Sequence, residues 1–286
     1  MEKSVSRRGR PQRNEGERLR ERMRTVALVR ELMHRSDVDN PNRFARWFDE
    51  EMRRRHPGRA WETESSGKWR KNYVGLTVLT EEQLSLLAEL FPGVWRFYQD
   101  GPEHLWEALW CSEEKLWDVC RLVGSEYDGQ PSSEHSVLAG VELTFDESLY
   151  NMESNLLTKW QYAQDDDSDT ALVVGDLAES ISLWRMHRRL NAIARTEGVG
   201  AYRSVQMCFA APIVRRRLHE LGVLDDLFAY VVNVEARRIE SEHAYRDSIA
   251  EACFGRRDQE FDATEYALDP FRFCSVEKRM ADLCVG

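Results

Sequence analysis

Two pairs of metal-binding residue types stand three positions apart in this sequence, Glu240 with His243 and His104 with Glu107. A glutamate followed three residues later by a histidine is half of the ligand motif of a ferritin-like di-iron site. A complete site also needs a second such pair and two more glutamates on facing helices. We therefore interpret Glu240 and His243 as a solvated helix face, and His104 and Glu107 as a capping or surface pair. We predict no metal site.

Motifs of the common enzyme classes are absent from the sequence. It contains no Walker loop, no dinucleotide-binding glycine fingerprint, no HExxH and no GxSxG. The six cysteines form no CxxC motif, and we interpret them as reduced thiols of a cytoplasmic protein. We accordingly predict that the protein is not an enzyme and carries no cofactor.

The segment 65–73, SSGKWRKNY, has the composition of a short DNA-reading helix. Trp69 and Tyr73 are four residues apart and share one helix face, on which they can anchor the helix. Polar and basic residues fill the other positions, as a helix that reaches phosphates and base edges requires. The candidate DNA-contacting residues of this segment are Ser66, Lys68, Arg70 and Lys71.

Residues 42–91 resemble the cro/repressor-type (XRE-like) DNA-binding domains. In that family the third helix carries a tryptophan and ends at a glycine turn, and a leucine-rich fourth helix follows; Trp69, Gly75, Leu84 and Leu87 match this skeleton. The resemblance implies a helix-turn-helix fold, binding of double-stranded DNA and a role in transcriptional regulation. The sequence departs from the pattern in its long second turn, RRRHPGRAWETES, and in the two leucines at 76 and 79.

A second resemblance covers about residues 65–110. The pattern GKWxxYxxG…FPG…LW.AL is similar to that of an uncharacterised proteobacterial family, and it implies no activity. The alternative to a DNA-binding regulator is a non-enzymatic helical adaptor that binds a protein partner, in a mobile-element or phage-defence context. A recognition helix must present Lys68, Arg70 and Lys71 in the open, whereas an adaptor can bury or pair them.

Charge is distributed unevenly along the chain. Residues 1–72 contain 20 Lys and Arg against 12 Asp and Glu, a net charge of +8, whereas residues 73–286 contain 20 against 38, a net charge of −18. This polarity favours contact between the front of the chain and a polyanion. Arg7, Arg8 and Arg10 lie in a segment almost without apolar residues and are candidate phosphate or minor-groove contacts. The alternative is an inert solvated tail.

The scarcity of breakers, with 8 Pro and 16 Gly, and the helical spacing of apolar residues predict an all-α protein. A helix-turn-helix-like module is expected to precede a helical C-terminal domain. The predicted parts are a disordered basic arm at 1–16, the module at 17–124, a linker at 125–133 and an oligomerisation or effector domain at 134–286. The segment 228–234, FAYVVNV, has strand propensity, but the helical spacing around it predicts a helix.

The second half of the chain offers a surface for a partner. Apolar residues between 137 and 160 occupy more than one helix face, which is typical of a central helix or an oligomer interface. We expect a homodimer, or a protein partner bound through these helices. The arginines between 184 and 217 are either a binding patch or, because this half is acidic, internal ion-pair partners. No run approaches the ~18 apolar residues of a membrane-spanning helix, so we predict a cytoplasmic protein.

Overall fold

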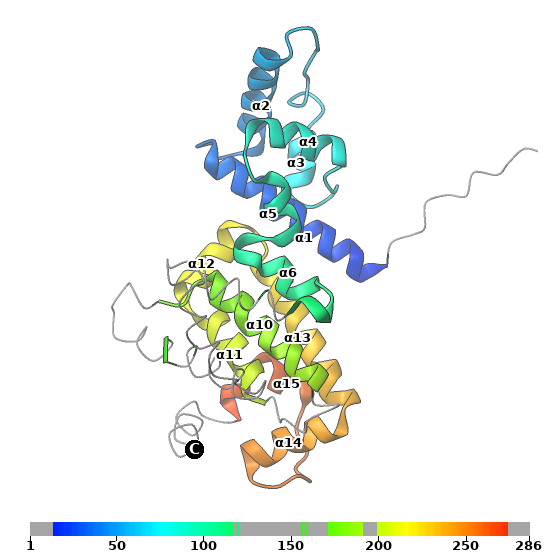
Figure 1. Cartoon of the computed structure of the whole chain (residues 1–286), viewed down its shortest axis with the longest axis vertical. Helices are drawn as coiled ribbons and strands as arrows, with labels where there is room; N and C mark the ends of the chain where they lie inside the picture. The colour runs from blue at the N-terminus through cyan, green and yellow to red at the C-terminus, as the bar shows by residue number, and fades with distance from the viewer. Residues whose placement is uncertain are drawn as a thin grey trace, which may run out of the picture. The chain divides into compact units, whose positions relative to one another are not determined.

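The computed structural model describes residues 14–116, 119, 156, 158–159, 171–190 and 199–273. Every regular element within these ranges is an α-helix or a short 3-10 helix (Figure 1). The all-α prediction is thus confirmed for the described part of the chain. No helix in that part is long and apolar enough to cross a membrane.

The chain divides into two compact units, residues 1–90 and residues 91–286. The sequence pattern predicts a first module that extends to residue 124. The structure instead places the tryptophan-rich segment after residue 91 in the second unit, because this segment packs against a later helix of that unit. The predicted linker at 125–133 lies outside the described residues.

The first unit contains four helices, α1 (Glu15–Arg35), α2 (Pro41–Arg55), α3 (Lys68–Tyr73) and α4 (Glu81–Leu90). Polar side chains cap the N-termini of α1, α2 and α4, whereas α3 begins after Gly67 without a side-chain cap. Asn14 and Glu17 form a reciprocal capping box on α1, and the Asn40 side chain accepts from two backbone amides of α2. Thr80 caps α4, since the backbone N–H of Gln83 donates to its Oγ1 at 3.2 Å.

The core of the first unit is formed by the central stretch of α1 and one face of α2, which both pack on α3. The central stretch of α1 is buried from Val26 to Val29. Helix α2 turns Phe44, Phe48 and Met52 inward with helical spacing. Both helices contact α3, so the short basic segment is held on two sides.

The second unit contains two groups of helices in the described ranges. The first group is α5 (Val94–Asp100), η1 (Pro102–His104), α6 (Leu105–Trp110) and η2 (Glu113–Lys115). The second group is α10 (Val174–Leu190), α11 (Val199–Ala210), α12 (Pro212–Glu220), α13 (Leu224–Ser241), α14 (His243–Phe254), α15 (Ala263–Leu268) and η4 (Pro270–Arg272). The segment 228–234 lies within α13, so its predicted helical state is confirmed.

Helix α10 is the central element of the second unit. It contacts both α6 and α11 (Figure 1), and it is buried at nearly every position from Val174 to Trp184. Polar contacts fix its position beside α6. Glu103 Oε2 accepts from the backbone N–H of Gly175 at 2.6 Å, and the Arg185 guanidinium donates to the carbonyl oxygens of Ala108 and Cys111 at 2.6 and 2.8 Å. These contacts satisfy backbone groups at the helix ends, which have no partner within their own helix.

Candidate nucleic-acid interface

A buried tryptophan anchors the basic helix α3. Trp69 is 1% exposed, and its ring meets those of Phe44 and Phe48 edge-on, with centroids 5.4 and 4.9 Å away. Its indole Nε1 donates to Thr63 Oγ1 at 2.9 Å. Edge-to-face aromatic packing and a satisfied indole N–H both hold a ring in one orientation. The anchoring role predicted for Trp69 is therefore confirmed.

The long turn between α2 and α3 is folded around one buried carboxylate. Asp49 on α2 accepts from the backbone N–H and the hydroxyl of Thr63, at 3.1 and 2.7 Å, and from the backbone N–H of Glu64 at 3.2 Å. These bonds draw residues 63 and 64 back onto α2. The segment that departs from the repressor pattern is thus a defined loop that positions the start of α3.

The four candidate residues at 66–71 occupy three different environments. Arg70 and Lys71 are exposed, and neither side chain forms a hydrogen bond or ion pair with another described residue. Ser66 is exposed and donates to the carbonyl oxygen of Thr63 at 3.1 Å. Lys68 is half-buried and lines a cavity of about 160 Å³ with Phe48 and others. Of the candidate cations on α3, only Arg70 and Lys71 are thus both exposed and unpaired among the described residues, as a recognition helix requires.

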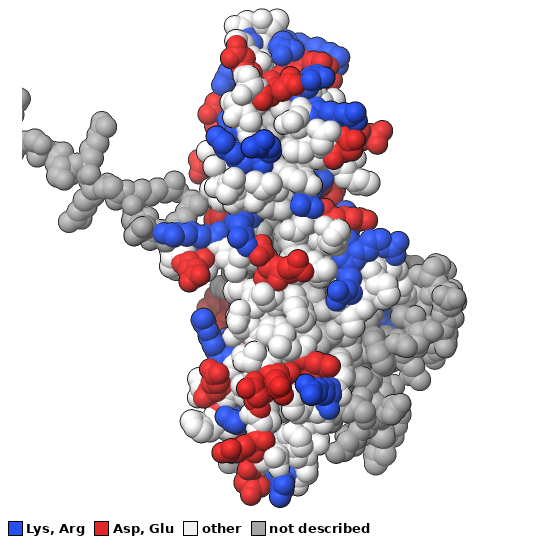
Figure 2. Space-filling view, turned by 180° about the vertical axis from the view of Figure 1, so that it is seen from behind, with Lys and Arg blue, Asp and Glu red and all other residues white. Residues whose placement is uncertain are grey.

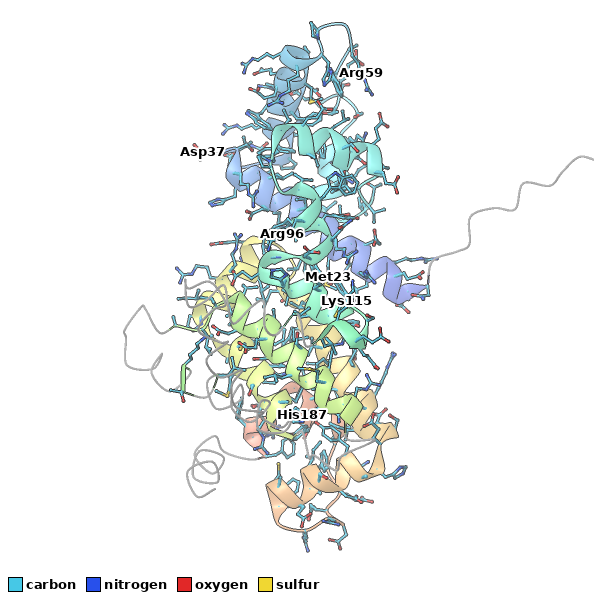
Figure 3. The ribbon with its side chains drawn as sticks, in the orientation of Figure 1. Met23, Asp37, Arg59, Arg96, Lys115 and His187 are labelled. Atoms are coloured by element: carbon cyan, nitrogen blue, oxygen red, sulfur yellow. The ribbon has the colours of Figure 1, made fainter. Side chains whose placement is uncertain are left out.

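Other arginines of the first unit are already paired with carboxylates. Arg43 lies 3.0 Å from Asp39, and Arg46 lies 2.7 Å from Glu64. The hydrogen bond from Arg46 lowers the pKa of Glu64. Arg59, in the loop after α2 (Figure 3), lies 3.1 Å from Glu82. These pairs leave less free positive charge than the composition suggests, and Figure 2 shows basic and acidic groups interspersed over the first unit.

Helix α1 adds two arginines beside α3. The Arg30 guanidinium lies over the Tyr73 ring, with its Cζ 4.5 Å from the ring centroid. The Arg22 side chain lies against Gly75, where an added Cβ would stand 2.6 Å from its Cγ. Gly75 has φ +73°, as predicted for a C-terminal glycine. Two half-buried arginines of α1 therefore lie beside the C-terminal end of α3.

Two apolar residues beside these cations are not among the predicted site residues. Val74 and Leu76 are 54% and 77% exposed. No local signal identified them, because a leucine after a helix-ending glycine normally packs back on its helix. They are the large apolar residues that the described part of the first unit leaves exposed.

The remaining candidate regions are only partly described. Arg7, Arg8 and Arg10 lie outside the described residues, as do residues 137–155 of the expected partner surface. In the second arginine cluster, Arg185 binds backbone carbonyl oxygens and Arg188 lies 3.7 Å from Glu242. Arg215 and Arg216 are exposed on α12. The cluster is therefore divided between internal contacts and open positions.

The two histidine pairs differ from each other in the structure. Glu240 and His243 lie on different helices, since α13 ends at Ser241 and α14 begins at His243. His104 is buried and bonds Glu107 through Nδ1 at 2.8 Å, while Arg96 Nη2 lies 3.2 Å from its Nε2. With Asp100, this pair forms a cluster whose possible ligand atoms all lie within 4.8 Å of one another. A buried histidine hydrogen-bonded to a half-buried glutamate replaces the surface pair of the expectation, and His104 occupies the N-cap position of α6 without a side-chain capping bond.

Comparisons with known proteins identify no relative of this chain from which a function could be inferred. No protein-family model, no curated protein sequence and no solved structure matches this chain.

Proposed function

We propose that the protein binds double-stranded DNA through the surface formed by α3 and the adjoining face of α1, and that it acts as a transcriptional regulator. The observation that carries the proposal is the state of Arg70 and Lys71. Both side chains are exposed and unpaired among the described residues, on a helix fixed by the buried Trp69. A cation already paired with a carboxylate must break that pair to meet a phosphate, whereas these two need not.

The size of α3 limits what it can read. Its six residues span about 9 Å at 1.5 Å per residue, which brings only a few side chains to base edges. Phosphate contacts by Arg70, Lys71 and the basic arm therefore supply most of the affinity, and base readout contributes less. The proposal thus predicts strong salt dependence with modest sequence selectivity.

The test is fluorescence anisotropy of the full chain on labelled pooled duplex DNA, at several salt concentrations. Arg70→Ala with Lys71→Ala should weaken binding about tenfold or more and flatten the log–log salt slope by about 1.8, because each lost phosphate contact removes about 0.9. The matched control is Arg43→Ala with Arg46→Ala, which removes two cations that carboxylates already hold. It should change the affinity much less.

Two outcomes would contradict the proposal. If the wild-type chain does not bind DNA at low salt, DNA binding is rejected and the helical adaptor remains as the alternative hypothesis. Equal losses in the α3 variant and in the control would mean that net charge, and not this helix, determines binding. A further variant without residues 1–13 tests the arm, and its loss should be similar for all DNA sequences.

A further inference from the structure

Leu76 is held outward in a well-formed helix-ending turn. The backbone N–H of Gly75 donates to the carbonyl oxygen of Asn72 at 3.0 Å, and the N–H of Leu76 donates to that of Lys71 at 2.9 Å. This is the Schellman arrangement, in which the residue at the Leu76 position usually packs on the residue at the Lys71 position. Here Leu76 is instead 77% exposed.

A buried amide makes the turn after Leu76 rigid. Asn72 is 1% exposed; its Nδ2 donates to the carbonyl oxygen and the hydroxyl of Thr77 at 2.8 and 3.1 Å. Its Oδ1 accepts from Gln83 Nε2 at 3.1 Å. The backbone N–H of Leu79 donates to Thr25 Oγ1 on α1 at 3.1 Å. Leu76 thus lies between α3 and the hydrogen-bonded segment 77–79, so the backbone on both sides of this exposed leucine is held in place.

The surroundings of Leu76 combine apolar surface with free positive charge. Val74 is 54% exposed beside it, and Arg70 and Lys71 lie one turn earlier without a partner among the described residues. A protein-docking surface normally presents a wider contiguous apolar patch than two side chains provide. A DNA-bending protein combines cations for the phosphates with a single apolar wedge for a base step.

We infer that Leu76 is a wedge that inserts between base pairs of the bound duplex and kinks it. This inference rests on the proposed DNA binding and names the kind of DNA that is favoured. Unstacking is least costly at pyrimidine–purine steps, so a TA or CA step beneath the turn should be preferred. Selectivity would then arise from deformability more than from hydrogen bonds to bases.

The experiment measures energy transfer between dyes at the two ends of a short duplex with a central TA step, titrated with the full chain. The wild-type chain should bend this duplex by about 20–90°. Leu76→Ala should abolish the rise in transfer. Its affinity should change less than about tenfold, because the unstacking cost is lost together with the contact. Leu76→Met, which keeps an apolar side chain of similar length, should restore the bend.

The control is Leu268→Ala, which removes another exposed leucine, 49% exposed and located in the second unit; it should bend DNA as the wild type does. Binding and bending by Leu76→Ala equal to those of the wild type would overturn the wedge and leave DNA binding intact. Wild-type binding without bending would do the same. Absence of wild-type binding would overturn both proposals.

Discussion

The indole Nε1 of Trp184 on α10 donates a 2.8 Å hydrogen bond to Oε2 of Glu235 on α13, 51 residues away in sequence. The other carboxylate oxygen, Oε1, accepts from the Tyr245 hydroxyl at 2.6 Å. Glu235 is fully buried, and this burial raises its pKa, although the nearby Arg238 and the two hydrogen bonds act in the opposite direction. A single ionisable group therefore links three helices in the core of the second unit.

The raised pKa of Glu235 predicts a pH-dependent stability. The folded state holds the proton more tightly than the unfolded state, whose pKa is near 4.5. The contribution of Glu235 to the free energy of unfolding is therefore most favourable below pH 4.5, and it falls as pH rises from there to the folded-state pKa. Urea unfolding across this range should show a fall in the wild type that is smaller in Glu235→Gln. Glu240→Gln, on the exposed face of the same helix, serves as the control and should retain the wild-type profile.

Gly75 is expected to tolerate no side chain. Its φ of +73° costs an L-residue about 1–2 kcal/mol, and an alanine Cβ would stand 2.6 Å from Arg22 Cγ. Gly75→Ala should lower the free energy of unfolding of the first unit by at least that amount, measured by urea denaturation. Gly58→Ala is the matched control, because Gly58 has no positive φ and its Cβ would meet nothing within 4 Å. A destabilisation by Gly58→Ala as large as that of Gly75→Ala would show that the backbone conformation is not the cause.

Trp69 and Thr63 should be energetically coupled through their 2.9 Å hydrogen bond. Trp69→Phe keeps an aromatic ring against Phe44 and Phe48 but leaves a cavity, and Thr63→Val keeps the volume at residue 63. Each substitution removes the bond, and the packing cost of Trp69→Phe cancels in the cycle because it is present with either residue at 63. Thr63→Val also removes the hydroxyl that donates to Asp49. A double-mutant cycle should give a coupling of about 0.5–1.5 kcal/mol for one hydrogen bond. Strictly additive effects would indicate that aromatic packing alone fixes α3.

The local features of this fold could be predicted from sequence, because neighbouring residues determine them. Thr80 and Gln83 cap α4 through hydrogen bonds three residues apart, and Gly75 ends α3 at a left-handed conformation. Pro212 begins α12, as a residue that lacks a backbone donor does. Each of these depends on a contact of a few residues, which the sequence displays directly.

The features that the sequence did not reveal depend on distant partners. Lys68, a predicted DNA contact, is half-buried and lines a cavity together with Arg59 and Trp61 of the loop before α3. The first unit ends at Leu90 because α6 packs on α10, more than sixty residues later. The sequence around Leu76 does not predict its exposure, because a leucine after a helix-ending glycine usually packs against that helix.

His104 supplies the last prediction, because it combines backbone strain with full hydrogen bonding. It has φ +63°, next to Glu103 at φ +47°, and two adjacent left-handed residues other than glycine are costly. Glu107 and Arg96 meet its two ring nitrogens at 2.8 and 3.2 Å, so the imidazole compensates for that strain. His104→Gly removes about 1–2 kcal/mol of strain but also removes two hydrogen bonds to charged groups, each worth about 1.5–3 kcal/mol. The net expectation is that His104→Gly lowers the melting temperature of the second unit in thermal unfolding.

Zn²⁺ should leave the wild-type melting temperature unchanged, because Arg96 and Glu107 already contact the two ring nitrogens of His104. A rise in melting temperature with Zn²⁺ that His104→Gly abolishes and His219→Gly preserves would instead identify Asp100, His104 and Glu107 as metal ligands.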